Sequence, residues 1–271
     1  MSATSQDRDV NQLGTGHRIR LIVFRVLAAL AGLFFLVAVV LMASAPWILL
    51  QPDQLARTEA NRWFLTVAGS VDAITCGVLL ALAHRPKRTL LIVELLAAVI
   101  VAGAIILPFQ PSFAGILAVA VIPLIAYPYW RDTRAFATWW KSPQPAHLIL
   151  AVLAAVGLLV TAAITLPRQI GWTDQAAQAG WWSDYAEHVT VLALAGVLGA
   201  SRGPGWRILT SLCSAVWLYL GLIATLVLPR HTGSWGRIGG IAALLIGVGF
   251  AVAAWQGDKH RSPGPPSPSR A

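Results

Sequence analysis

Charged residues are scarce in this chain of 271 residues. Only 11% are Asp, Glu, Lys or Arg and 57% are hydrophobic, whereas an ordinary soluble domain has about 25% charged residues. A soluble globule of this size cannot cover its surface with so few polar side chains. The scarcity therefore excludes a soluble enzyme and, despite the net charge of +9, a nucleic-acid-binding domain.

Cysteines and catalytic motifs are also few. Cys76 and Cys213 lie in apolar runs without a CxxC or a metal-ligand spacing, so both are expected to be buried, reduced thiols. No P-loop, HExxH, GxSxG or GxGxxG motif occurs in a supporting context, and no histidine pair has the spacing of haem ligands. The sequence predicts neither a cofactor nor a metal.

Apolar runs fill most of the chain, whose mean hydropathy is +0.68. Only α-helices and closed barrels satisfy their backbone in lipid, and these runs lack the alternation of barrel strands. We therefore expect an all-α polytopic membrane protein with eight transmembrane helices. The predicted spans are 21–46, 63–83, 89–107, 113–129, 147–166, 185–201, 207–228 and 236–255. The first run is too long for a signal peptide, so none is expected.

Lys and Arg collect on one predicted side of the membrane. About three quarters of the 20 lie in or beside the tails and in the loops at 85–88, 131–141 and 202–207. The exceptions are Arg57, Arg62, Arg168, Arg230 and Arg237. The positive-inside rule then predicts a plasma-membrane protein with both termini in the cytoplasm. Its expected partners are membrane lipids and other membrane proteins, with no nucleic acid.

The two halves of the chain resemble each other. VLAALAGL at 26–33 matches VLAAVGLL at 152–159. Further matched pairs are Trp63 with Trp182, Gly77 with Gly196, Arg88 with Arg207, and Leu107-Pro108 with Leu228-Pro229. A duplicated unit of four spans returns to its starting side, so the halves would be parallel about a pseudo-twofold axis, and binding sites in such architectures lie between the halves.

This duplication predicts the domain organisation. Residues 19–140 would form one four-helix unit and residues 141–257 the second. The tails, 1–18 and 258–271, are polar or rich in Pro and Ser, so they are expected to be disordered.

Asp72 stands near the middle of the second predicted span. An ionisable group at that depth costs about 2.5 to 3.5 kcal/mol, so it should face the bundle interior and find a partner or water. Gly69 and Cys76 lie nearby and leave room for another helix. Two interpretations remain open: Asp72 is a proton carrier, general acid or cation ligand, or it makes one interhelical hydrogen bond that holds the bundle.

Glu94 and Glu187 are the other candidate acids. Glu94 lies inside the start of the third predicted span, where it can also snorkel towards Arg88 at the interface. Glu187 stands next to His188 near the outer start of the sixth span. The candidate catalytic or proton-carrying residues are thus Asp72, Glu94 and Glu187.

The start of the sixth span also has a structural interpretation. Asp184 and Glu187 complement a helix dipole there, and Ser183 is expected to be the N-cap. Glu187 with His188 is alternatively a proton relay or a divalent-metal site, although neighbouring residues do not share a helix face.

Other residues are expected to shape the bundle. Pro123 should kink the fourth span, and Gly236 with Gly240 forms a GxxxG close-packing face. Trp63 and Trp182 lie near predicted outer span ends, where indoles prefer the half-wet membrane interface.

Three segments carry a resemblance to other proteins: EANRWFLTVAGSVDAITCGVLLALAHRPKR at 59–88, the Leu-Pro turn at 107–108, and RGPGWRIL at 202–209. They resemble a group of uncharacterised polytopic membrane proteins common in high-GC Gram-positive bacteria. The resemblance implies a plasma-membrane location and says nothing about activity.

Three functions fit the sequence. The first is a small permease or an accessory subunit of a transport or envelope-assembly complex, with a polar path between the halves. The second is an intramembrane enzyme acting on a lipid or isoprenoid, for example by acid-catalysed terpene cyclisation, since an acid kept neutral in an apolar pocket can protonate an alkene. The third is a membrane scaffold whose polar groups only specify packing.

Overall fold

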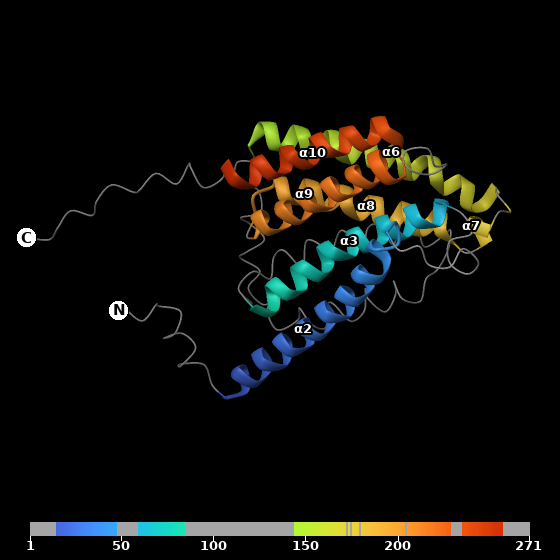
Figure 1. Ribbon diagram of the computed structural model, residues 1–271. Coiled ribbons are helices and arrows are strands. Elements are labelled where there is room, and N and C mark those ends of the chain that lie inside the picture. Colours follow the sequence, from blue (N-terminus) through green and yellow to red (C-terminus); the bar gives the residue numbers. More distant parts are fainter. Residues whose placement is uncertain are drawn as a thin grey trace, which may run out of the picture.

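The computed structural model describes residues 15–47, 59–84, 144–171, 173, 175–178, 180–203, 205–228 and 235–256. The regular structure of this part of the chain is all helical (Figure 1). Its long helices are α2 (Thr15–Ala43), α3 (Glu59–His84), α6 (Pro145–Gly171), α8 (Trp181–Ala200), α9 (Trp206–Leu222) and α10 (Gly236–Gln256). A short helix, α7 (Gln175–Gln178), follows α6, and a π-helical turn, η4 (Ile223–Val227), extends α9.

The protein is an integral multi-pass membrane protein. Five described helices are long and apolar enough to cross a bilayer, over Leu21–Ala43, Arg62–His84, Pro145–Gly171, Trp206–Val227 and Gly236–Gln256. These match the first, second, fifth, seventh and eighth predicted spans. The third and fourth predicted spans, with Glu94 and Pro123, lie outside the described residues, so the count of eight stays a prediction.

Helix α8 coincides with the sixth predicted span but is not among those five. Asp184, Glu187 and His188 occupy its first two turns and lower its hydropathy. Most of its residues are nevertheless buried, because α8 packs against α3, α6 and α9. No large hydrophobic side chain of α8 is exposed, so it is an inner helix of the described bundle.

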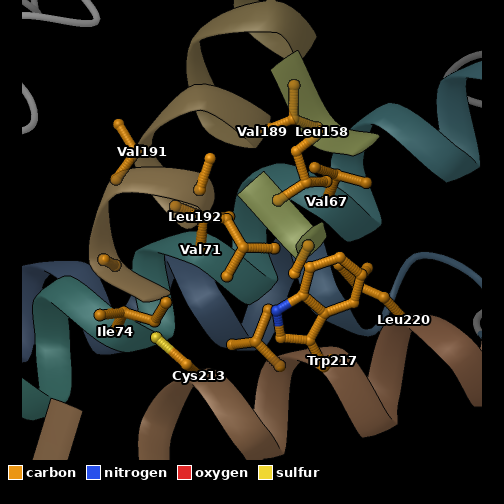
Figure 2. Packing of buried hydrophobic residues seen from close by; sticks show 14 of the residues in the cluster. Val67, Val71, Ile74, Leu158, Val189, Val191, Leu192, Cys213, Trp217 and Leu220 are labelled. Atoms are coloured by element: carbon orange, nitrogen blue, oxygen red, sulfur yellow. The ribbon is translucent and has the colours of Figure 1, made fainter. Parts of the chain in front are cut away.

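The helices pack as three neighbouring pairs. Helix α2 lies along α3, α6 along α8, and α9 along α10 (Figure 1). The core forms where α3, α8 and α9 meet, with α6 beside them. Figure 2 shows Ile74 of α3, Leu192 of α8 and Cys213 of α9 converging there. Because lipid is as apolar as these side chains, close packing rather than escape from water stabilises this core.

The outer faces of the bundle are apolar. Helices α2, α6 and α10 expose large hydrophobic side chains, for example Phe34 at 73% and Ile238 at 87%. Lipid tails solvate such side chains without the penalty that water would impose.

Small residues let α9 and α10 approach closely. A Cβ atom on Gly240 would lie 2.3 Å from Thr225 Oγ1, and one on Gly247 would lie 2.7 Å from the Leu218 side chain. The hydroxyl of Ser214 donates a 2.7 Å hydrogen bond to the Gly247 carbonyl. Gly236 instead begins α10 with a φ of 63°, so Gly240 and Gly247, two turns apart, make this contact.

Two expectations about the helix ends that the sequence predicts to be outer are wrong. Trp63 and Trp182 are buried, at 0% and 3% exposure, rather than half-wet at the interface. The reason is an aromatic cluster in which Trp63 packs edge-on against Trp235 at 5.1 Å between centroids, and Phe64 packs edge-on against Trp182 at 5.0 Å.

The N-cap of α8 is the second correction. Gly180, with a φ of 77°, precedes the helix, and no side chain caps it. The Ser183 hydroxyl donates to the Gly180 carbonyl at 2.8 Å. Ser183 therefore lies inside the first turn, because the helix begins at Trp181, two residues before Ser183.

Candidate functional site

The candidate site lies where α3 faces α8. Asp72 is half-buried midway along α3, and Glu187 with His188 is half-buried in the second turn of α8. Phe64 contacts both Trp182 and Tyr185, which fixes the level at which α3 and α8 meet. Eight residues separate Phe64 from Asp72, whereas Glu187 is five residues from Trp182 and two from Tyr185. Asp72 therefore lies one to two helical turns, roughly 5 to 9 Å, farther from that contact than Glu187.

The charges of these residues act on one another. His188 interacts electrostatically with Asp72, Asp184 and Glu187. Glu187 also interacts with Asp72 and Asp184. His188 of α8 is therefore within electrostatic range of Asp72 of α3, and the packing of α3 on α8 places the two predicted site residues Asp72 and Glu187 on neighbouring helices.

The hydrogen bond of His188 sets its tautomer. Its Nδ1 lies 2.6 Å from the Asp184 carbonyl oxygen. A carbonyl only accepts, so Nδ1 carries the hydrogen.

The chemistry available to these residues is that of carboxylates and an imidazole in a largely apolar bundle. Among the described residues, no group of three or more His, Cys, Asp or Glu side chains has the arrangement to hold a metal ion. Cys76, one turn from Asp72, is a buried free thiol whose environment includes the charge of Asp72. Glu94, the third predicted acid, lies outside the described residues.

A cavity of about 480 Å³ lies on another side of α3, between α2, α3 and α9. Gly69, Ser70 and Ala73 line its α3 wall, but Asp72 does not. At its edge the Trp47 indole donates a 2.9 Å hydrogen bond to the Tyr219 hydroxyl, which in turn donates to the Ala43 carbonyl. The predicted acids and the apolar cavity are therefore separate features.

Sequence patterns missed one polar cluster. His147, at the start of α6, is 2% exposed and lies near Arg202 and Trp206 at the opposite end of the bundle from Trp63. A histidine at the first residue of an apolar run did not indicate a site in the sequence. Only the fold places His147 beside residues that follow about 55 positions later.

Comparison with protein-family models, curated proteins and solved structures finds no match to this chain. The resemblance to membrane proteins of high-GC Gram-positive bacteria therefore stays a prediction, whereas the multi-pass helical architecture stands on the structure itself.

Proposed function

We propose that the protein is a small permease, or an accessory subunit of a transport or envelope-assembly complex, whose polar site is formed by Asp72, Glu187 and His188. The observation that carries the proposal is the packing of α3 on α8, which brings the mid-helix acid of α3 into the electrostatic range of the acid and the histidine of α8. Intramembrane ionisable residues that face one another are typical of proton and ion pathways.

The predicted duplication would place this pair of helices between the two halves of the protein. Helices α3 and α8 would be the second helices of the two four-helix units, and each packs against its own first helix, α2 or α6. Trp63 and Trp182, which match in the sequence, both lie buried in the outer aromatic cluster. These two similarities support a pseudo-twofold arrangement with Asp72 and Glu187 between the units.

Proton flux tests the proposal. The full chain would be reconstituted in liposomes that contain a pH-sensitive dye, and proton entry would be followed under an imposed membrane potential. We expect the wild-type chain to carry protons, and Asp72→Asn and Glu187→Gln to reduce the flux at least about tenfold, since each removes a titrating group from the path.

A matched control is available on α8, outside the proposed site. Asp184 is an exposed acid at the outer start of α8, so Asp184→Asn should leave most of the flux. Wild-type flux in Asp72→Asn would contradict the proposal. Glu94→Gln belongs in the same series, because Glu94 remains a proposed member of the site on sequence grounds.

A second candidate is an intramembrane enzyme acting on a lipid or isoprenoid. The cavity between α2, α3 and α9 favours it, since its volume of about 480 Å³ is in the range of small-molecule sites. Incubation of membranes with labelled prenyl substrates would test it, and conversion by the wild type would favour catalysis over transport. Because Asp72 does not line the cavity, Asp72→Ala would show separately whether this acid takes part in the conversion. A scaffold role would follow if neither flux nor conversion occurs and the acid variants have no phenotype.

A further inference from the structure

The end of the bundle where α6 and α9 begin holds a cluster of polar residues that the proposed transport site does not use. His147 is in the first turn of α6, and Arg202 and Trp206 lie at the junction of α8 and α9. Gln144 immediately precedes α6. The cluster is defined here as Gln144, His147, Arg202 and Trp206.

His147 is buried without a hydrogen bond. Only 2% of its surface is exposed, and among the described residues neither ring nitrogen has a partner. Its ring packs edge-on against Phe250 at 5.4 Å between centroids and lies 6.2 Å from the ring of Trp206. A buried polar group left unpaired is unfavourable, which indicates that a hydrogen-bonding ligand completes the cluster.

Arg202 follows the end of α8 with a backbone φ of 58°, and its side chain contacts two other members of the cluster. One Nη donates a 2.9 Å hydrogen bond to the Gln144 side-chain oxygen, and the guanidinium carbon lies 5.2 Å from the Trp206 ring centroid. Its Nε is buried and has no hydrogen-bond partner among the described residues. The Nε–H group of Arg202 and the ring nitrogens of His147 are thus available to hydrogen-bond a ligand.

The electrostatics of the cluster favour an anion. Helices α6 and α9 both begin here, and neither has an acidic residue in its first turn. Gly205 precedes α9 without capping it by a side chain. Two positive helix ends therefore add to the charge of Arg202. A second arginine, Arg207, has its guanidinium carbon 5.5 Å from the centroid of the Trp206 ring.

We propose that this cluster binds a phosphate group, carried by an anionic lipid or by a soluble phosphate compound. Arg202 donates to phosphate oxygens through the N–H groups that Gln144 leaves unused, and His147 donates from one ring nitrogen. Guanidinium groups match phosphate geometry better than any other side chain, and the ring of Trp206 suits the depth of a headgroup.

Binding to the purified full-length chain tests the proposal. The protein would be stripped of phospholipid in a neutral detergent and titrated with inorganic phosphate, with short-chain phosphatidylglycerol, and with a diacylglycerol of equal chain length that lacks phosphate. Indole emission reports binding because Trp206 belongs to the cluster, and the melting temperature should rise with any ligand specific for the folded state.

The expected result is saturable binding of at least one phosphate probe and none of the diacylglycerol. Binding of both phosphate probes identifies a soluble phosphate compound as the ligand class, and binding of phosphatidylglycerol alone identifies a lipid headgroup. Arg202→Gln should weaken binding about ten- to hundredfold, and Arg202→Lys should weaken it less. Arg237→Gln, an exposed cation at the opposite end of α10, is the matched control and should bind as wild type.

His147→Phe keeps the variant series informative if an Arg202 variant fails to fold. It removes the unpaired polar group and retains an aromatic ring, so the protein should fold, yet phosphate binding should fall. The proposal is overturned if no phosphate probe binds, if the diacylglycerol binds equally well, or if both Arg202→Gln and His147→Phe retain wild-type affinity.

Discussion

The indole N–H of Trp235 donates a 2.9 Å hydrogen bond to the hydroxyl of Tyr185, which joins the start of α10 to the first turn of α8. Tyr185 is 2% exposed, and Trp235 also packs against Trp63 and Trp217, at 5.1 Å and 5.4 Å between centroids. This polar contact lies inside an aromatic cluster that links α3, α8, α9 and α10.

Replacing that hydroxyl should destabilise the protein. Tyr185→Phe keeps the ring but leaves the Trp235 N–H without its acceptor, at a cost of about 1 to 3 kcal/mol. The free energy of unfolding in detergent micelles, followed by helix content, measures the effect. Tyr219→Phe is the comparison. It removes the bonds to the Trp47 indole and to the Ala43 carbonyl, but Trp47 is 55% exposed and Ala43 is only half-buried, so both groups can bond to water or headgroups. A larger loss there would contradict this account.

The contact between α9 and α10 should not tolerate a methyl group. In Gly240→Ala the new Cβ would lie 2.3 Å from Thr225 Oγ1 and 2.9 Å from the Gly221 carbonyl oxygen. Relief of this overlap must separate the helices, with an expected loss of about 1 to 3 kcal/mol in unfolding free energy.

Gly157→Ala provides the control for that substitution. A Cβ on Gly157 of α6 meets no atom within 4 Å, and Ala favours the helix over Gly by about 0.5 to 1 kcal/mol. Gly157→Ala should therefore be neutral or stabilising. Equal destabilisation by both variants would show that helix packing is not the cause.

Asp72 and His188 should be energetically coupled. Unfolding free energies of Asp72→Asn, His188→Gln and the double variant form a cycle, and we expect an interaction energy of about 0.5 to 3 kcal/mol, because each residue lies in the electrostatic environment of the other. The same cycle with His84, which is exposed in the last turn of α3, should be additive. Additivity in both cycles would show that Asp72 and His188 do not interact measurably.

The predicted orientation can be measured by cysteine labelling. Cys76 and Cys213 are buried, and replacing both by Ala gives a background for single cysteines at Arg237 and Gln256, exposed residues at the two ends of α10. With the C-terminus in the cytoplasm, an impermeant maleimide should label position 237 in intact cells and position 256 only after permeabilisation. The reverse pattern would invert the topology.

Much of the helix pattern could be predicted from hydropathy, because lipid imposes a helix on any long apolar run. The ends were less predictable. Helix α6 continues through Pro167 to Gly171, five residues beyond the predicted span, because proline near the end of a helix removes only one backbone hydrogen bond.

The partners of the polar residues were beyond prediction. Asp72 could be singled out by its depth, but only the packing of α3 on α8 supplies His188 as its neighbour. The burial of Trp63 and Trp182 likewise depends on rings contributed by other helices, whereas the interfacial preference of tryptophan describes an isolated helix. His147 gave no sequence signal for the same reason.

Helix α8 has a consequence for biogenesis. Its first two turns carry Asp184, Glu187 and His188, so on its own it would partition poorly from the translocon into lipid. Its long neighbour α6 is strongly apolar and packs along its length. The two helices should therefore leave the translocon as a hairpin, with α6 sheltering the polar turns until α3 and α9 enclose them.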